Sequence, residues 1–181
     1  GGLISYLSDN NLLSPEETLT IYLNTLKSMN TEQMGDYLGI ESLLNTSDSD
    51  KNSIASALVE QVHQNFDFKI TSCEEQGYTA TISTEITTFD SSAILNTFSE
   101  EQDAYLSSAN AVIDGSEKRY LKTLEMLLND IENNTATITS TADFHLTNDG
   151  VSWKLDDSNT TIGNAIFGTL SNSPVSEETA E

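Results

Sequence analysis

The chain has 181 residues, and 29 acidic residues against 7 basic ones give it a formal net charge of −22. Nucleic-acid binders need a basic patch that displaces counterions from phosphate, and here only Lys118, Arg119 and Lys122 cluster. No apolar run reaches the roughly 18 residues of a membrane-spanning helix. The single Cys73 allows neither an intramolecular disulfide nor a cysteine-based zinc cluster. We therefore expect no nucleic-acid partner, no membrane span, no metal and no cofactor.

Three helices are predicted in the first third of the chain, after a leader at residues 1–13. Residues 14–17 (Ser-Pro-Glu-Glu) supply a capping serine, a proline suited to the first helical turn, and a glutamate that completes a capping box. An apolar stripe follows at helical spacing: Leu19, Tyr22, Leu23, Leu26 and Met29. Further helices are predicted at residues 31–39 and, after a polar loop, around residues 54–62.

The period of the apolar residues then changes to two, which is typical of strands. Phe66, Phe68 and Ile70 predict the inner face of a first strand, and a turn is expected at residues 74–77. The inner face of the next strand is predicted to hold Tyr78, Ala80, Ile82, Thr84 and Ile86. The two strands form a hairpin whose other face is wet and rich in threonine.

A helical block is predicted from about Ser91 to Glu132, with a break at residues 114–116. Leu106 and Val112 belong to the apolar stripe of its first part. Alternation then returns at Thr135, and the inner face of this strand is predicted to hold Ala136, Ile138, Ser140, Ala142, Phe144 and Leu146.

The turn signal Asn-Asp-Gly at residues 148–150 leads into a closing strand with Val151, Trp153 and Leu155 facing inward. A last amphipathic helix is expected at residues 162–170, and residues 171–181 are expected to form a disordered acidic tail. Helices and hairpins are thus segregated, which favours an α+β domain over alternating βαβ units. We expect one domain at residues 14–170, in which N-terminal helices and a central helical insertion pack on one face of a curved, antiparallel, four-stranded sheet.

Five short stretches resemble the cystatin-like or nuclear-transport-factor-2-like domains of secreted lipoproteins of Gram-positive bacteria. The opening of those domains is similar to residues 14–17, 22–27 and 37–38, and their closing hairpin is similar to residues 150–155. Their C-terminal segment is similar to residues 164–170. The resemblance implies an extracytoplasmic protein held at the cell surface by a lipid anchor upstream of this chain. It implies no catalytic residue, because these families share no catalytic motif.

An apolar ligand pocket is expected between the first helix and the concave sheet. Its predicted lining is Tyr22, Phe68, Tyr78, Phe144 and Trp153. The competing interpretation is that these side chains only form the core. A second candidate surface is the threonine-rich outer face of the sheet, which could pair with another protein or form a homodimer. Its competing interpretation is an ordinary solvated face.

Enzyme chemistry has few candidates in this sequence. His63 and His145 are the only histidines, and neither lies in a metal-binding or nucleophile motif. Cys73 lacks the cationic neighbours that activate a thiol. Residues 48–52 imitate the first half of a calcium loop, but the glycine and the final glutamate of such a loop are missing, so a helix cap explains them better.

We therefore expect a non-enzymatic, extracytoplasmic domain that binds a protein, peptide or small ligand. A small pocket enzyme of the isomerase or dehydratase type is the first alternative, and it needs a buried carboxylate or histidine in an open cavity. A self-associating structural domain is the second alternative.

Overall fold

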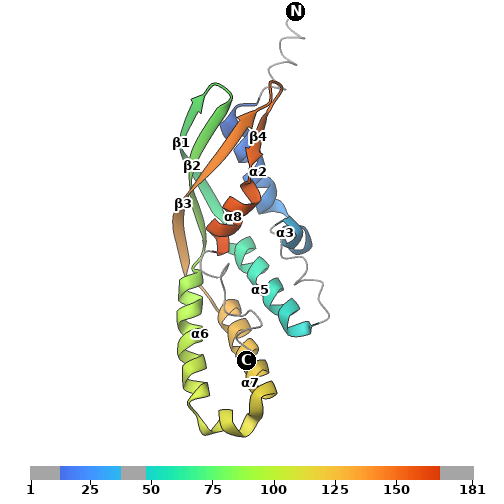
Figure 1. Ribbon diagram of the computed structural model, residues 1–181, viewed down its shortest axis with the longest axis vertical. Coiled ribbons are helices and arrows are strands. Elements are labelled where there is room, and N and C mark those ends of the chain that lie inside the picture. The colour runs from blue at the N-terminus through green and yellow to red at the C-terminus, as the bar shows by residue number, and fades with distance from the viewer. Residues whose placement is uncertain (1–12, 38–47, 168–181) are drawn as a thin grey trace, which may run out of the picture.

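A computed structural model describes residues 13–37 and 48–167 of the chain. These ranges contain six helices and a four-stranded antiparallel sheet, which confirms the predicted α+β class. The strands β1 (Asp67–Gln76), β2 (Thr79–Phe89), β3 (Thr137–Asn148) and β4 (Trp153–Asp156) lie in the order of the sequence. In Figure 1 the helices that contact the sheet lie on one side of it, and a helical arm extends beyond its lower end. Of the expected leader only Leu13 is described, and the expected tail at residues 171–181 lies outside the described residues.

The helices α2 (Pro15–Ser28), α3 (Thr31–Tyr37) and α5 (Ser49–Asn65) begin where their capping residues place them. Glu17 N–H donates to Ser14 Oγ at 3.0 Å, and Ser14 N–H donates to Glu17 Oε1 at 2.9 Å, so the predicted capping box is present. The carboxylate of Asp48 accepts from the N–H groups of Asp50 and Lys51. Residues 48–52, which resemble the first half of a calcium loop, therefore form the start of a helix.

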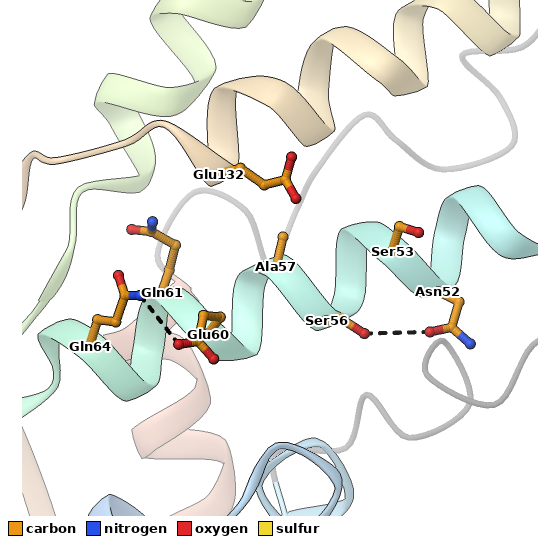
Figure 2. Close-up of a pocket in the computed structure, with 8 residues that line it drawn as sticks. All are labelled: Asn52, Ser53, Ser56, Ala57, Glu60, Gln61, Gln64 and Glu132. Atoms are coloured by element: carbon orange, nitrogen blue, oxygen red, sulfur yellow. Dashed lines mark hydrogen bonds between the residues drawn. The ribbon is translucent and has the colours of Figure 1, made fainter.

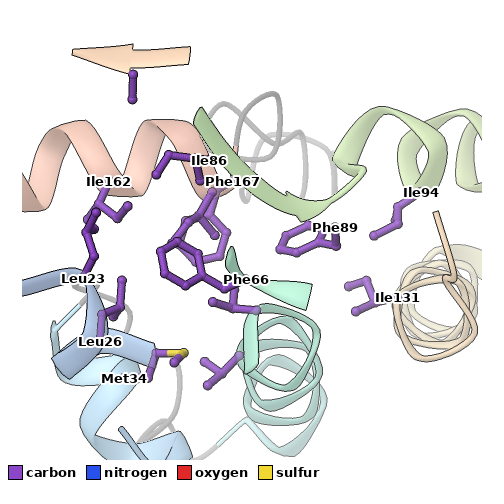
Figure 3. Close-up of a cluster of buried hydrophobic side chains, with 14 of the residues drawn as sticks. Leu23, Leu26, Met34, Phe66, Ile86, Phe89, Ile94, Ile131, Ile162 and Phe167 are labelled. Carbon is purple, nitrogen blue, oxygen red and sulfur yellow. The ribbon is translucent and has the colours of Figure 1, made fainter. Parts of the chain in front are cut away.

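The core lies between the inner face of the sheet and the helices α2, α5 and α8 (Ser158–Phe167). Figure 3 shows side chains from all of these helices meeting around the ring of Phe66. Leu23 and Leu26 come from α2, and Ile162 and Phe167 come from α8. The period-two pattern of β2 is real, because Ala80, Ile82, Thr84 and Ile86 are all buried.

The first hairpin contains an irregularity that the alternating pattern does not reveal. The register between β1 and β2 shifts between Ile70 and Ser72. One extra residue in β1 turns the following side chains over, so Cys73 lies opposite Ile82 on the inner, half-buried side. Burial is the largest cause that raises the pKa of the Cys73 thiol, and Glu16 and Glu75 raise it further.

Four residues expected on the inner face are exposed, namely Tyr78, Ile138, Ser140 and Val151, and here the predicted burial was wrong. Tyr78 is 69% exposed because it lies in the turn before β2, and Val151 is 72% exposed because it lies before β4. Ile138 keeps the inner register, opposite buried Thr88, yet it is 46% exposed. The helices leave this end of β3 uncovered.

The central helical insertion forms an arm of two antiparallel helices, α6 (Ser91–Leu106) and α7 (Ala109–Glu132). Their main contacts are with each other and between α7 and α5, so the arm meets the sheet only at its base (Figure 1). The chain reverses at residues 107–108, which the sequence did not predict. The predicted break at residues 114–116 is a kink inside α7, where Gly115 has a φ of 81°.

Candidate functional site

The five side chains predicted to line an apolar pocket do not come together around one. Phe144 is fully buried in the core, and Tyr78 is exposed in a turn, so Tyr78 is wrong as a lining residue. Tyr22, Phe68 and Trp153 are partly buried and pack against the core. The interpretation of these residues as core therefore describes four of the five.

Trp153 lies beside a shallow pocket of about 280 Å³ where the start of α2 meets the end of the sheet. It is the one member of the predicted set that lines this pocket, whose other lining residues include Ser14, Glu17, Glu75 and Asn148. The hollow is thus mixed in character, with Leu13, Pro15 and Trp153 as its apolar lining.

A larger pocket of about 580 Å³ lies along α5 and reaches the end of α7. Figure 2 shows Glu60, Gln61 and Gln64 from α5 facing the same space as Glu132 from α7. Gln64 Nε2 donates to Glu60 Oε1 at 3.2 Å, which holds one side of the opening. The lining contains no histidine, cysteine or basic residue.

The amide of Gln61 at the floor of this pocket connects α5 to the segment before β3. Gln61 is buried, and its Nε2 donates to the backbone oxygen of Asn134 at 3.3 Å. Asn134 Nδ2 donates back to Gln61 Oε1 at 3.1 Å and also to the backbone oxygen of Ala136. A buried amide with these partners is satisfied, so its role is to fix the linker and not to capture a ligand.

The outer face of the sheet is a surface that the helices leave uncovered (Figure 1). Its side chains pair across β2 and β3. Thr81 Oγ1 lies 3.2 Å from His145 Nδ1, and Thr87 Oγ1 lies 2.8 Å from Thr139 Oγ1. Between these two pairs, Ser83 Oγ donates to Asp143 Oδ1 at 2.8 Å.

This hydroxyl ladder defines the outer-face site: Thr81, Ser83, Thr87, Thr139, Asp143 and His145. The side chains are held by one another, so they present donors and acceptors at fixed positions on a flat surface. Such a surface can hydrogen-bond to a partner at little additional cost in side-chain entropy. The pattern of alternating threonines predicted this face, and the structure confirms its register.

The two histidines do not form a catalytic pair. His63 is exposed on α5, and its Nε2 contacts the backbone oxygen of Met29 at the end of α2. His145 is exposed on β3, beside Thr81. No group of three potential ligand side chains could hold a metal ion among the residues that the structure describes. Within the same ranges, no helix is both long and apolar enough to span a membrane.

The tip of the arm is held by an ion-pair network that uses the chain's one basic cluster. Tyr105 on α6 donates its hydroxyl to Asp114 Oδ2 at 2.5 Å, and Lys122 Nζ lies 2.8 Å from the same oxygen. Lys118 Nζ lies 3.7 Å from Asp114 Oδ1. The hydrogen bond from Lys122 is the largest cause that lowers the pKa of the Asp114 carboxyl, followed by the hydrogen bond from Tyr105.

This network fixes a turn that exposes apolar side chains. Arg119 Nη1 donates to the backbone oxygen of Ala111 at 2.6 Å, while the neighbouring Val112 and Ile113 are 80% and 78% exposed. Leu106 is 47% exposed. The prediction that Leu106 and Val112 belong to a packing stripe was therefore wrong, because Leu106 ends α6 just before the turn at residues 107–108 and Val112 lies just after it.

We expect Asp114→Asn to loosen the tip of the arm without unfolding the chain. The amide keeps the size of the carboxylate but loses its ion pairs with Lys118 and Lys122, so backbone amides at residues 109–114 should exchange hydrogen faster. Because the folded pKa of Asp114 is lowered from 3.8, its contribution is present above about pH 4 and is lost as the pH falls through the lower, folded value.

Hydrogen exchange followed by mass spectrometry measures this effect, with Glu117→Gln as the control that removes an exposed charge from the same helix. Unchanged exchange at residues 109–114 in Asp114→Asn would mean that the network does not hold the tip.

Asp130 on α7 is buried, at 8% exposure. Its Oδ2 has no hydrogen-bond partner. Burial is the largest cause that raises the pKa of Asp130 to about 7, and the carboxyl of Glu101 on α6 raises it further. A hollow of about 500 Å³ alongside is lined by Glu101 and Asn129 but not by Asp130 itself. The sequence does not mark Asp130 as unusual, since its position in the helical pattern carries no sign of the facing glutamate.

No protein-family model and no curated protein sequence matches the chain. Among solved structures, the chain is similar to a crystal structure from Bacillus subtilis subsp. subtilis str. 168 that carries the name "putative lipoprotein (ycdA)". The two share 14% sequence identity with a TM-score of 0.49, over 85% of this chain and 47% of that chain. This chain thus spans about half the length of that protein.

Proposed function

We propose that the chain is a non-catalytic binding domain that acts outside the cytoplasm, where it holds a protein, peptide or small ligand against its sheet. One observation carries the proposal: the hydrogen-bonded outer-face site is broad, polar and uncovered, whereas the described pockets are shallow and lack a nucleophile paired with a base.

The location belongs to the proposal and rests on the resemblance of residues 14–17 and 150–155 to cystatin-like or nuclear-transport-factor-2-like domains of surface lipoproteins. A lone cysteine is compatible with an oxidising compartment, because it leaves no second thiol in the chain to pair with. A charge of −22 keeps such a domain soluble and apart from an anionic membrane surface.

Site-specific photo-crosslinking in the cells that produce the protein tests this proposal. A crosslinking residue replaces Thr87 on the outer face, and in a matched control it replaces Ser53 on α5. We expect a defined, light-dependent product from the first position only, recovered with the extracytoplasmic or membrane fraction. Products from neither position, or a product in the cytoplasmic fraction, would contradict the proposal.

The alternative of a small pocket enzyme would use Asp130, whose raised pKa suits acid–base chemistry near neutral pH. Against it, Asp130 does not line the neighbouring hollow, so a substrate placed there would not touch the carboxyl. The alternative of self-association through the outer face predicts a dimer in sedimentation, and a variant Thr87→Arg should then sediment as a monomer.

A further inference from the structure

The outer side of β3 lacks a neighbouring strand over most of its length. β3 pairs with β2 from Thr137 to Thr147, but β4 pairs only with residues 145–148. In an antiparallel strand, alternate residues direct their N–H and C=O groups to opposite sides. Within residues 137–144, the N–H and C=O groups that point away from β2 have no backbone hydrogen bond in the described part of the chain. We call residues 137–144 the open edge; eight residues of strand extend for roughly 27 Å.

Residues 137–142 of the open edge carry none of the features that usually protect an edge strand, and Asp143 near its end is its one charge. Natural sheets protect their edges with charges, proline, bulges or very short strands. Residues 137–142 contain no charge, no proline and no glycine, and consist mainly of residues that favour strands. The opposite edge of the same sheet, β1, carries Lys69, Glu74 and Glu75 and a register shift after Ile70. The sheet therefore protects one edge and leaves the other available.

The side chains of the open edge are accessible as well. Every residue from 137 to 141 is exposed, including Ile138, which lies in the inner register. A strand added here continues the pleat of β3, so its side chains alternate between the two faces. One set would lie beside Ile138 and Ser140, and the other beside Thr139 and Thr141. This arrangement selects an extended segment with apolar side chains toward Ile138.

The charge distribution decides between a second copy of the chain and a foreign segment. Asp143 is exposed at the end of the open edge, and exposed Glu85 lies opposite Thr141 on the neighbouring strand. A second copy would bring another formal charge of −22 to this edge, and repulsion disfavours that pairing. A segment with basic side chains on its outer face is attracted instead.

We propose that the open edge of β3 accepts an extended, positively charged segment of a partner protein as a fifth strand of the sheet. This inference rests on the proposed binding role and names the chemistry and the binding mode of the partner. Backbone hydrogen bonds supply the affinity, and the apolar and basic faces of the segment supply the specificity.

A synthetic peptide of alternating valine and lysine, long enough to cover the open edge, is the probe for this mode. We expect saturable binding to the full chain, weakened by added salt, with slower hydrogen exchange of the amides at residues 137–144. Methylation of every second peptide nitrogen on its pairing side should abolish binding, because it removes the backbone donors. Replacement of lysine by glutamate should also abolish it.

Two variants test whether the peptide binds at the open edge of β3 and not at the opposite edge of the sheet. Ile138→Lys adds a charge to the open edge and should weaken binding about tenfold or more, since lysine is a standard means of protecting an edge. Ser72→Lys adds the same charge to the exposed, opposite edge on β1 and should leave the affinity within about twofold. Thr139→Lys, on the outer face, replaces Ile138→Lys if the thermal midpoint of that variant falls.

Four outcomes would overturn the inference: no saturable binding, equal binding of the methylated peptide, equal weakening by Ser72→Lys, or slow exchange in the free chain of those amides at residues 137–144 that point away from β2. A dimer that Ile138→Lys converts to a monomer would replace the partner segment with a second copy. None of these results affects crosslinking from Thr87, which tests the broader binding role, so failure of the two proposals can be told apart.

Discussion

Phe89→Ala is expected to lower the free energy of unfolding by about 3–5 kcal/mol, the range typical for truncation of a buried aromatic residue. Phe89 ends β2 just before α6 and is fully buried. Its ring centroid lies 6.3 Å from that of Phe167 on α8, at an interplanar angle of 60°. Figure 3 shows the same ring beside Ile94 and Ile131 of the arm. Its loss leaves a cavity where the sheet, α8 and the arm meet, and urea unfolding measures the result.

Tyr78→Ala is the matched control, because it also removes one aromatic ring from the first hairpin. Tyr78 is exposed, so this change should stay within about 0.5 kcal/mol of the parent chain. A cost below about 1 kcal/mol for Phe89→Ala would mean that the arm is not packed on the sheet.

The order of helices and hairpins could be predicted because each element repeats a simple period over many residues. Leu19, Leu23 and Leu26 of α2 follow the helical period and are all fully buried, and Ile82 and Ile86 of β2 follow the period of two. The capping box at residues 14–17 identifies its helix start from local hydrogen-bonding chemistry alone. These features are local, so the sequence carries them directly.

The wrong predictions concern residues whose burial depends on tertiary contacts and not on the period of the apolar residues. Tyr78 and Val151 fit the alternating pattern, but each lies in the turn before its strand, where no helix covers it. Ile138 has the correct register and is exposed because the helices do not reach that end of β3. The reversal at residues 107–108 contains two serines and no glycine or proline, so only the cap at Ser108 marks it.

The candidate site was predictable in part for the same reason. The outer-face site follows from the alternation of threonines, which places one whole set of side chains on the wet face. The open edge depends on β4 being four residues long beside a β3 of twelve, and no local pattern gives the length of a neighbouring strand. Gln61 and Asn134 are 73 residues apart in sequence, and only the packing of α5 against the linker unites them.

Asp130→Asn is expected to raise the free energy of unfolding by about 2 kcal/mol above pH 7, where the parent chain must bury an ionised carboxylate. The asparagine amide can donate to Glu101, as the proton on Asp130 does below its raised pKa. Well below pH 4, Asp130 is protonated in both the folded and the unfolded parent chain, so it does not lower the free energy of unfolding there. Between pH 4 and about 7 the unfolded chain loses the proton first, so this group lowers stability as the pH rises, and the penalty is constant above that range.

Urea unfolding of both chains at several pH values measures this difference, which should grow from near zero at pH 4 to its full value at pH 8. Asp103→Asn removes the same charge from an exposed site on α6, and its effect separates relief of the overall negative charge from relief at Asp130. Equal stabilisation by both variants would mean that the gain in stability comes from the smaller net negative charge of the chain. A loss of stability in Asp130→Asn at pH 8 would mean that the ionised carboxylate has a favourable partner, and the raised pKa would then be wrong. A gain in stability confined to Asp130→Asn would mean that the ionised Asp130 carboxylate destabilises the folded chain at neutral pH. Its burial and the facing Glu101 on the arm are the causes.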